Sequence, residues 1–329
     1  MTDAFLQSER LPKYGHLLKR HSGNPILEAT DWPYAANTVF NPGAIRLHDT
    51  GEVLLLVRVE GRRGHSHLCA ARSSDGINNW RIDRAPTLEL ERNLRPEGFW
   101  GIEDPRITWI PELRQYTVVY TAYSHGGPGV ALALTSDFTT FEHLGMVMPP
   151  EDKDAALFPR RVGGLWAMIH RPVPVSGAAH MWISFSPDMM HWGNHKVLMY
   201  AREGGWWDAR KIGLATPPIE TPEGWLLLYH GVRMTPAGCL YRVGLALLDL
   251  DNPLKVIRRS DEWIFGPLEP YERSGDVADV VFPCGTVMGE DGDSLFVYYG
   301  AADTCVCLAT ASIKELLEWL EDHNFEGIA

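Results

Sequence analysis

The sequence predicts an all-β protein, a five-bladed β-propeller with one short helix at its C-terminus. Three observations support this prediction. A short run of strand-forming residues recurs five times at intervals of roughly 50 to 70 residues, a similar strand precedes each run, and a third strand follows it. A sheet this small can bury both of its faces only against its neighbours, which favours radial repetition of the unit.

The central run of each repeat is apolar, β-branched and aromatic, and it is too short for a typical helix. The runs are Val53–Val59, Tyr116–Ser124, Leu165–Arg171, Trp225–Val232 and Leu295–Ala301. We expect the preceding strands to begin at Asn41-Pro42-Gly43, Asp104-Pro105-Arg106, Phe158-Pro159-Arg160, Asp208-Ala209-Arg210 and Phe282-Pro283-Cys284. Turns rich in Gly, Asn, Asp or Pro separate the two strands, which is typical of hairpins.

A third strand follows each central run. These strands are Leu68–Arg72, Val130–Thr135, Met181–Phe185, Arg242–Leu248 and Val306–Thr310. Three repeats then pass through a turn containing Ser and Asp to an aromatic residue, Trp80, Phe141 or Trp192. We expect that residue to open the outermost strand of its sheet.

A β-sandwich with coincidental spacing is the alternative, but a sandwich needs no fivefold repeat of the first strand. We therefore expect one catalytic propeller domain over residues 1–329. The segment Ile313–Asp322 is predicted to be helical because Leu316, Leu317 and Leu320 fall on one stripe. This helix is expected to pack against the propeller or against a partner subunit, so a homo-oligomer is possible.

Composition excludes several classes of function. The formal net charge of -12 argues against a nucleic-acid partner and against an anionic membrane surface. Residues 1–20 show no signal-peptide pattern, and the five cysteines are odd in number and scattered. We therefore expect reduced thiols and a cytoplasmic location. No metal is expected, because His65 and His67 have no evident third ligand.

Polar residues at the ends of otherwise apolar inner strands indicate a pocket on the propeller axis. They are Arg58, Glu103, Asp104, Arg106, His170, Arg171, Arg210, Lys211, His230, Tyr241, Arg242 and Asp303. A pocket of mixed carboxylates and cations suits glycosidic chemistry, because a carboxylic acid can protonate a leaving oxygen while other groups hold the hydroxyls. Trp100, Trp206 and Trp207 suit sugar stacking and core packing equally well.

Several motifs carry a family resemblance that spans the chain from about Asn24 to Asp303. They are Asn41-Pro42-Gly43, the segment 56–60 (LVRVE), the segment 101–106 (GIEDPR), the segment 153–159 (KDAALFP), His170-Arg171-Pro172 and Tyr229-His230-Gly231. Together they resemble glycoside hydrolase family 130, the β-mannoside phosphorylases and β-mannosidases with a five-bladed propeller fold.

The resemblance implies an inverting reaction with one catalytic acid, Asp104, which would act through the O3 hydroxyl of the sugar. Inorganic phosphate would attack the anomeric carbon and give α-mannose 1-phosphate, so no cofactor is expected beyond phosphate as co-substrate. The implied phosphate-binding residues are Arg171, Lys211, His230 and Tyr241. The expected sugar-binding residues are Asn41, Arg58, Glu103 and Asp303. We also expect the pKa of Asp104 to be raised, so that it holds a proton near neutral pH.

One residue departs from the resemblance, because Asp152 stands where an amide or basic residue is expected. That leaves open whether its loop binds phosphate. Individual site residues also have structural alternatives. Asp104 could cap a turn, Lys211 could be a solvated charge, His230 could be a core residue, and Arg58 could pair with Glu60 or Glu103.

Two other functions remain open. A hydrolase would need a base to activate water, for which Asp208, Asp276 or Asp279 are candidates. A non-catalytic carbohydrate-binding propeller would need no buried acid beside a group of cations. The acceptor sugar is also open, and the resemblance favours β-1,4 over β-1,2 linkages.

Overall fold

The computed structural model describes residues 17–90, 94–236 and 238–325. Residues 1–16, which form most of the segment used to argue against a signal peptide, lie outside the described residues. The fold is all-β with few helices, as predicted. No helix in the described ranges is long and apolar enough to cross a membrane.

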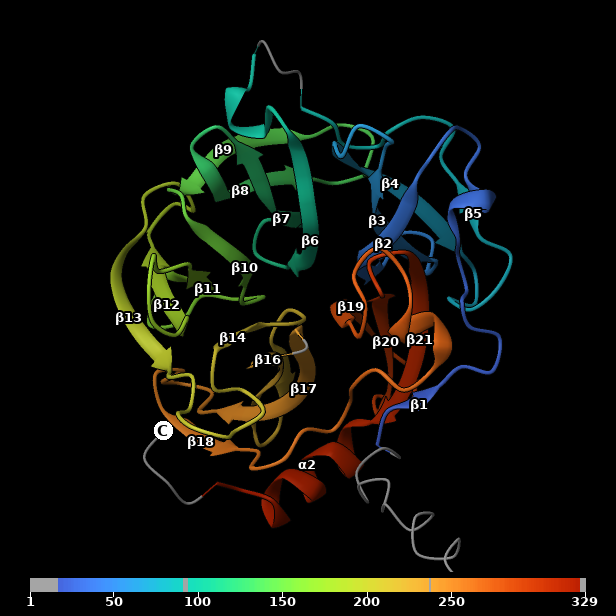
Figure 1. Cartoon of the computed structure of the whole chain (residues 1–329). Coiled ribbons are helices and arrows are strands. Elements are labelled where there is room, and N and C mark those ends of the chain that lie inside the picture. The colour runs from blue at the N-terminus through green and yellow to red at the C-terminus, as the bar shows by residue number, and fades with distance from the viewer. Residues whose placement is uncertain (1–16, 91–93, 237, 326–329) are drawn as a thin grey trace, which may run out of the picture.

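In the described part of the chain, the strands form groups that follow one another around a common centre (Figure 1). The first group is β2 (Thr38–Arg46), β3 (Val53–Glu60), β4 (Ser66–Ser73) and β5 (Arg81–Ile82), and the second is β6 (Gly101–Ile110), β7 (Gln115–Ser124), β8 (Gly127–Thr135) and β9 (Glu142–Met148). The third is β10 (Asp152–Leu157), β11 (Trp166–Pro172), β12 (Met181–Ser186) and β13 (Gly193–Met199). The fourth is β14 (Lys211–Leu214), β15 (Ile219–Thr221), β16 (Gly224–Thr235), β17 (Gly238–Leu248) and β18 (Val256–Arg259). The fifth is β19 (Val281–Met288), β20 (Ser294–Ala301), β21 (Cys305–Ser312) and β1 (Lys19–Arg20).

These strands confirm the predicted central and third strands of all the repeats. The pairing within each group is antiparallel, and one parallel bridge between Ser66 and Gly101 joins the first two groups. Trp80, Phe141 and Trp192 each precede the outermost strand of their group by one residue, as expected. Strand β1, which was not predicted, pairs with β21 and so places the N-terminal end of the described chain beside its C-terminal strands.

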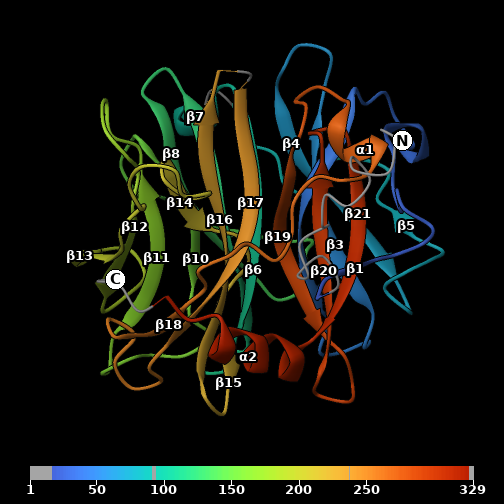
Figure 2. The same cartoon turned by 60° about the horizontal axis from the view of Figure 1, so that its bottom comes forward.

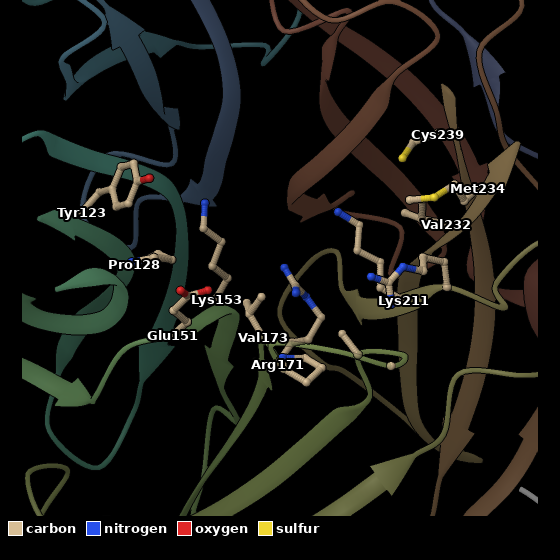
Figure 3. A pocket seen from close by; sticks show the side chains of 15 residues that line it. Tyr123, Pro128, Glu151, Lys153, Arg171, Val173, Lys211, Val232, Met234 and Cys239 are labelled. Carbon is tan, nitrogen blue, oxygen red and sulfur yellow. The ribbon is translucent and has the colours of Figure 1, made fainter. Parts of the chain in front are cut away.

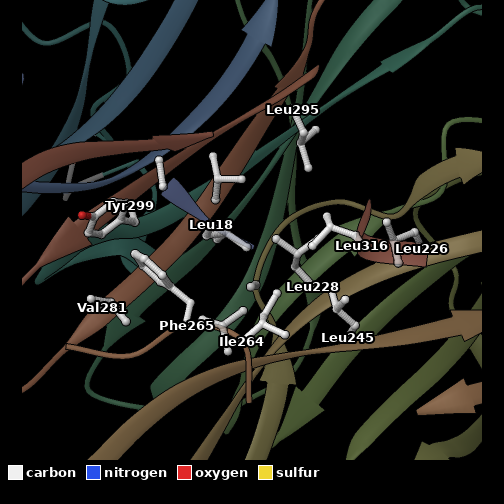
Figure 4. Close-up of a cluster of buried hydrophobic side chains, with 14 of the residues drawn as sticks. Leu18, Leu226, Leu228, Leu245, Ile264, Phe265, Val281, Leu295, Tyr299 and Leu316 are labelled. Carbon is white, nitrogen blue, oxygen red and sulfur yellow. The ribbon is translucent and has the colours of Figure 1, made fainter. Parts of the chain in front are cut away.

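Each sheet buries both faces because side chains alternate along a strand. In β3, Leu54 and Leu56 pack in the cluster shared with the second group. Val53, Leu55 and Val57 pack in the cluster shared with the fifth group. Figure 4 shows the equivalent cluster between the fourth and fifth groups, which includes Leu226, Leu245, Tyr299 and Leu316 among its side chains.

Besides the short helix α1 (Pro270–Arg273), the described residues contain the predicted helix α2 with the bounds Ile313–Asp322. Ser312 caps its N-terminus by accepting a hydrogen bond from the backbone N–H of Glu315. The stripe of Leu316, Leu317 and Leu320 is buried in the cluster between the fourth and fifth groups. Figure 2 shows α2 lying across one end of these sheets, so the packing of the helix against the sheets is confirmed.

The innermost strands β2, β6 and β10 share a bulge that the sequence analysis aligned only in part. Asn41, Asp104 and Asp154 occupy it with φ of 47°, 50° and 54°, and the strand register shifts at each of them. Asn and Asp tolerate this left-handed conformation better than other residues with a side chain. The expectation that the third group begins at Phe158 is therefore wrong, because that alignment followed the proline instead of the bulge.

Candidate active site

Eight of the nine site residues expected from the sequence line one cavity of about 230 Å³. They are Asn41, Arg58, Asp104, Arg171, Lys211, His230, Tyr241 and Asp303. Glu103 is not part of the lining but accepts a hydrogen bond from Arg58. The strands of every group therefore bring residues that are far apart in the chain to one space near the centre of the molecule.

Asp104 lies at the bulge of β6 with its carboxylate held by two neighbours. Asn41 Nδ2 donates to Asp104 Oδ1 at 2.9 Å, and Arg58 Nη1 donates to the same oxygen at 3.2 Å. Burial alone would raise the pKa of Asp104, but the positive charges of Arg58 and Lys153 outweigh it and lower the pKa. The expectation of a raised pKa is wrong for the unliganded site, because the sequence did not show how closely these cations approach.

Arg58 connects three carboxylates on this side of the cavity. Besides Asp104, its Nη2 atom donates to Glu60 at 3.1 Å and to Glu103 at 3.2 Å. The alternative that Arg58 pairs with Glu60 or Glu103 is thus correct, and the same side chain also lines the cavity. We call Asn41, Arg58, Asp104 and Asp303 the carboxyl wall.

Asp303 is the carboxyl group of this wall that keeps a proton near neutral pH. Burial raises its pKa to about 7, and the nearby negative charge of Asp104 acts in the same direction. Its backbone is left-handed, with φ of 51°. The wall therefore holds one carboxyl group of lowered pKa, Asp104, and one of raised pKa, Asp303.

The opposite side, which we call the cation wall, contains Arg171, Lys211, His230 and Tyr241. Lys211 Nζ donates to Tyr241 Oη at 2.8 Å. Burial lowers the pKa of His230, which favours its neutral form. These residues come from β11, β14, β16 and β17, so the third and fourth groups supply the whole wall.

Asp154, which was not among the expected site residues, anchors this wall. Arg171 Nε donates to Asp154 Oδ2 at 2.6 Å, and His230 Nε2 lies 3.3 Å from the same oxygen. Burial alone would raise the pKa of Asp154, but Arg171 and then His230 hold it well below its usual range. The close approach of His230 to Asp154 requires a glycine at position 213, since a Cβ on Gly213 would lie 2.6 Å from the His230 ring.

Lys153 was also missed, although it lies between the two walls. Its Nζ donates to Glu103 Oε2 at 2.9 Å, and its side chain lines the cavity. Burial alone would lower the pKa of Lys153, but the charges of Glu103 and Asp104 raise it. The signal was present in the sequence, because Lys153-Asp154 stands at the same bulge position as Glu103-Asp104.

Asp152 faces away from the cavity and supports Arg171 from behind. Its Oδ2 lies 2.6 Å from His170 Nδ1, and its Oδ1 accepts the backbone N–H of Arg171 at 3.1 Å. Ser184 Oγ continues this chain, at 2.7 Å from both His170 Nε2 and His195 Nδ1. The residue that departs from the family pattern is therefore a buried structural partner.

A second compartment of about 500 Å³, the vestibule, adjoins the cavity and shares three cations with it. Figure 3 shows Lys153, Arg171 and Lys211 extending from separate strands into the space between them. Tyr123, Glu151, Arg210, Met234 and Cys239 are among the residues that line the vestibule.

Other residues considered from the sequence lie outside the cavity. Asp208 is fully buried and paired with Arg259 at 2.7 Å, Asp279 pairs with Arg273 at 3.4 Å, and Asp276 accepts from Asn37 at 3.4 Å. None of these aspartates lines the cavity. Trp100 packs against Tyr123 and His125, while Trp206 and Trp207 line a separate cavity.

Residues 18–322 match the glycoside hydrolase family 130 profile, which is described as beta-1,4-mannooligosaccharide phosphorylase. The chain is 34% identical over 314 residues to the β-1,4-mannooligosaccharide phosphorylase of Ruminococcus albus, covering 93% of this chain and 91% of that protein. The solved β-1,2-mannobiose phosphorylase of Listeria innocua, in complex with β-1,2-mannobiose, superposes with a TM-score of 0.84 at 31% identity, covering 93% of this chain and 99% of that one.

A second solved structure superposes with a TM-score of 0.78 at 26% identity over 92% of this chain and 96% of that one. It is described as showing that this family of mannoside phosphorylases contains glycoside hydrolases that target β-1,2 mannosidic linkages in Candida mannan. The family match covers more than nine-tenths of the chain, and the two phosphorylases also match over almost their whole length. The chain therefore belongs to glycoside hydrolase family 130.

Proposed function

We propose that this chain is an inverting β-mannoside phosphorylase. It cleaves the bond between the anomeric carbon of a terminal β-mannosyl group and the glycosidic oxygen, and forms a bond from that carbon to a phosphate oxygen. The products are α-mannose 1-phosphate and an acceptor shortened by one mannosyl unit. The observation that carries this proposal is a single cavity with carboxyl groups on one wall and a group of cations on the other.

Asp104 is proposed as the proton donor, while Asn41, Arg58, Glu103 and Asp303 bind or position the terminal sugar. In the unliganded site Asp104 has a lowered pKa, so it needs a change in its surroundings before it can donate. A bound phosphate dianion supplies this change, since its charge offsets the cations that lower the pKa. The neighbouring Asp303 has a pKa raised to about 7, so it adds little negative charge beside Asp104 near neutral pH.

Arg171, Lys211, His230 and Tyr241 are proposed to bind phosphate. Arginine and lysine suit phosphate oxygens, and Tyr241, whose oxygen accepts from Lys211, can donate its own O–H. The Nε2 atom of His230 faces Asp154, so His230 donates to phosphate from Nδ1 when its ring is protonated. Phosphate is already a competent nucleophile and needs no base. An inverting hydrolase needs a carboxylate that is free to activate water, whereas the carboxylate on the cation wall, Asp154, is engaged by Arg171 and His230.

We infer that the fold is one five-bladed β-propeller domain. The supporting observation is that each group of strands packs through a separate apolar cluster on the group before it and the group after it. Pairing of β1 with β21 is the strand exchange expected where such a ring closes. The cysteines Cys69, Cys239, Cys284, Cys305 and Cys307 are free, which supports the proposed cytoplasmic location.

We further propose β-1,4-mannooligosaccharides as substrates, on the basis of the family description and the Ruminococcus albus relative. The test is incubation of the full chain with β-1,4-mannobiose or β-1,2-mannobiose in phosphate buffer, followed by ³¹P and ¹H NMR. Formation of α-mannose 1-phosphate from the β-1,4 substrate supports both parts of the proposal. The β-anomer would refute inversion, and reaction of the β-1,2 substrate alone would refute the linkage.

A further inference from the structure

A cavity of about 430 Å³ outside the active site is lined by three tryptophans and three charged residues. It is formed by Glu203, Gly205, Trp206, Trp207, Arg233, Glu262 and Trp263, and we call it the tryptophan cavity. The function proposed above assigns no role to any of these side chains. Trp206 is 37% exposed, which is a large indole surface to leave in contact with water.

The three indole rings are held in place by neighbours, with Trp206 exposed and Trp207 buried at the base of the cavity against Tyr229. The Arg202 guanidinium lies 4.4 Å from the ring centre of Trp206, and that of Arg242 lies 4.4 Å from the ring centre of Trp263. Trp207 donates from Nε1 to the Asp261 carbonyl at 3.1 Å. The aromatic surface is thus fixed before any ligand arrives, which reduces the entropy lost on binding.

The charged side chains of the cavity are weakly held: burial raises the pKa of Glu262, on which the nearby charges of Asp261 and Arg202 act in opposite directions. In the described ranges, no hydrogen bond or ion pair involves the side chains of Glu203, Arg233 or Glu262, although opposite charges line the same space. Glu203, Glu262 and Arg233 line the space, and the guanidiniums of Arg202 and Arg242 lie against two of its indole rings, so the cavity carries charges of both signs. Carboxylate and guanidinium groups are well suited to hydrogen-bonding hydroxyl groups of a neutral ligand.

The position of the cavity connects it with the active site. Val232 and Met234 of β16 line the vestibule, while Arg233 between them lines the tryptophan cavity on the opposite face of the strand. The two compartments therefore lie on either side of the β16–β17 hairpin. An extended ligand bound in the tryptophan cavity would be held close to the route into the active site.

We propose that the tryptophan cavity is a second carbohydrate-binding site that holds a β-mannooligosaccharide. Indole faces pack against the C–H face of a sugar ring, and the charged side chains of the lining bind its hydroxyls. The choice of a β-mannoside as the neutral, hydroxyl-rich ligand rests on the proposed function. The site retains longer substrates near the enzyme and takes no part in bond cleavage.

Binding is tested with the full chain carrying Asp104→Asn, so that the sugar is not consumed. We expect β-1,4-mannohexaose to shift the indole ¹H–¹⁵N NMR signals of Trp206 and Trp263, identified with Trp206→Phe and Trp263→Phe. Unchanged signals of both indoles at millimolar sugar would overturn the proposal without touching the proposed function. Signals that respond to protein concentration instead of sugar would also overturn it, since they would indicate contact between copies of the chain.

Kinetics on the active enzyme provide the second measurement. Trp206→Ala and Arg233→Ala are expected to raise KM for mannohexaose by roughly three- to tenfold, as for loss of one aromatic or charged contact, with KM for mannobiose unchanged. Tyr200→Ala is the matched control, because Tyr200 is 54% exposed on the same segment but does not line the cavity. An equal rise of KM for both substrates would contradict a site for longer chains.

Discussion

Two aspartates at the same bulge of neighbouring repeats differ in their surroundings and in the roles we propose for them. Asp104 on β6 and Asp154 on β10 share a left-handed backbone and line the same cavity. Asp104 is hydrogen-bonded by Asn41 and by an arginine that it shares with two glutamates. Asp154 has Arg171 at 2.6 Å and His230 at 3.3 Å.

The position in the repeat determines where each carboxylate lies, whereas the neighbouring side chains determine whether it can take up a proton. A carboxylate that shares its arginine with other acids can take up a proton when the charge around it changes. A carboxylate in close contact with its own arginine stays ionised and serves as an anchor. The same position in the repeat thus supports a proposed acid in one group of strands and a structural ion pair in the next.

The largest expected effect is on turnover, through Asp104→Asn. Asparagine keeps the shape and tolerates the positive φ, but it cannot donate the proton, so kcat should fall by a factor of about 10²–10⁴. Circular dichroism and the thermal midpoint should stay close to the wild type. A variant that retains most of its phosphorolysis rate would show that the proton comes from another group.

The matched substitution, Asp154→Asn, should act mainly on stability. It leaves the buried Arg171 without its ion-pair partner, which typically costs about 3–5 kcal/mol. Urea denaturation should therefore give a much lower midpoint than for Asp104→Asn, together with a higher KM for phosphate. If the two variants were equally stable, the distinction drawn between the two aspartates would fail.

The raised pKa of Asp303 predicts a pH dependence of stability. Its folded pKa of about 7 lies above the ordinary value of 3.8, so between these values the folded state keeps a proton that the unfolded state has lost. The proton on Asp303 therefore adds to the free energy of unfolding. This contribution is present in full below pH 4 and is lost as the pH rises towards 7, at about 1.4 kcal/mol per unit of pKa difference.

Urea denaturation between pH 4 and 8 checks this expectation. Asp303→Asn should remove this part of the decline in stability. Asp104→Asn should reduce it, because the charge of Asp104 helps to raise the pKa of Asp303. Identical pH profiles for the wild type and Asp303→Asn would contradict the assignment.

A smaller effect, on the KM for phosphate, is expected from His170, which lies behind the cation wall. His170→Ala removes the partner of Asp152, which accepts the backbone N–H of Arg171, and should raise KM for phosphate by roughly three- to tenfold, as for loss of one hydrogen bond. The KM for the mannoside and kcat should change less than twofold. His191→Ala is the control, since its exposed hydrogen bond with Asp188 lies away from the cavity. Parallel changes in both KM values would indicate a general loss of structure.

The sequence predicted the features that depend on local pattern. Alternating strands such as Val53–Glu60 and the capped helix Ile313–Asp322 follow from periodicity, so the structure confirms them. Eight members of the cavity lining were predicted, from the family resemblance and from the polar residues at the ends of the inner strands. Lys153 and Asp154 were missed because a proline-based alignment hid the bulge they share with Glu103-Asp104.

The electrostatics of the site were the least predictable part. The lowered pKa of Asp104 depends on Arg58 from β3 and Lys153 from β10, whose distances from the carboxylate arise only when the strands assemble. The hydrogen-bond partner of Asp152 is His170, which likewise lies on the facing strand β11. The short strand β1 carries too few residues for a periodic signal, although it pairs with the last strand.

The most direct test of the central claim is the rate of β-1,4-mannobiose cleavage as a function of phosphate concentration, starting from none. For the wild type, we expect the cleavage rate to rise hyperbolically with phosphate concentration from zero in its absence. For Lys211→Ala we expect about 10- to 100-fold weaker apparent phosphate affinity, as for the loss of a charge-assisted contact of about 1.5–3 kcal/mol. Arg210 is the neighbouring residue and lines the vestibule but not the cavity, so Arg210→Ala should change the apparent phosphate affinity much less. Equal release of mannose without phosphate would contradict the claim and establish a hydrolase.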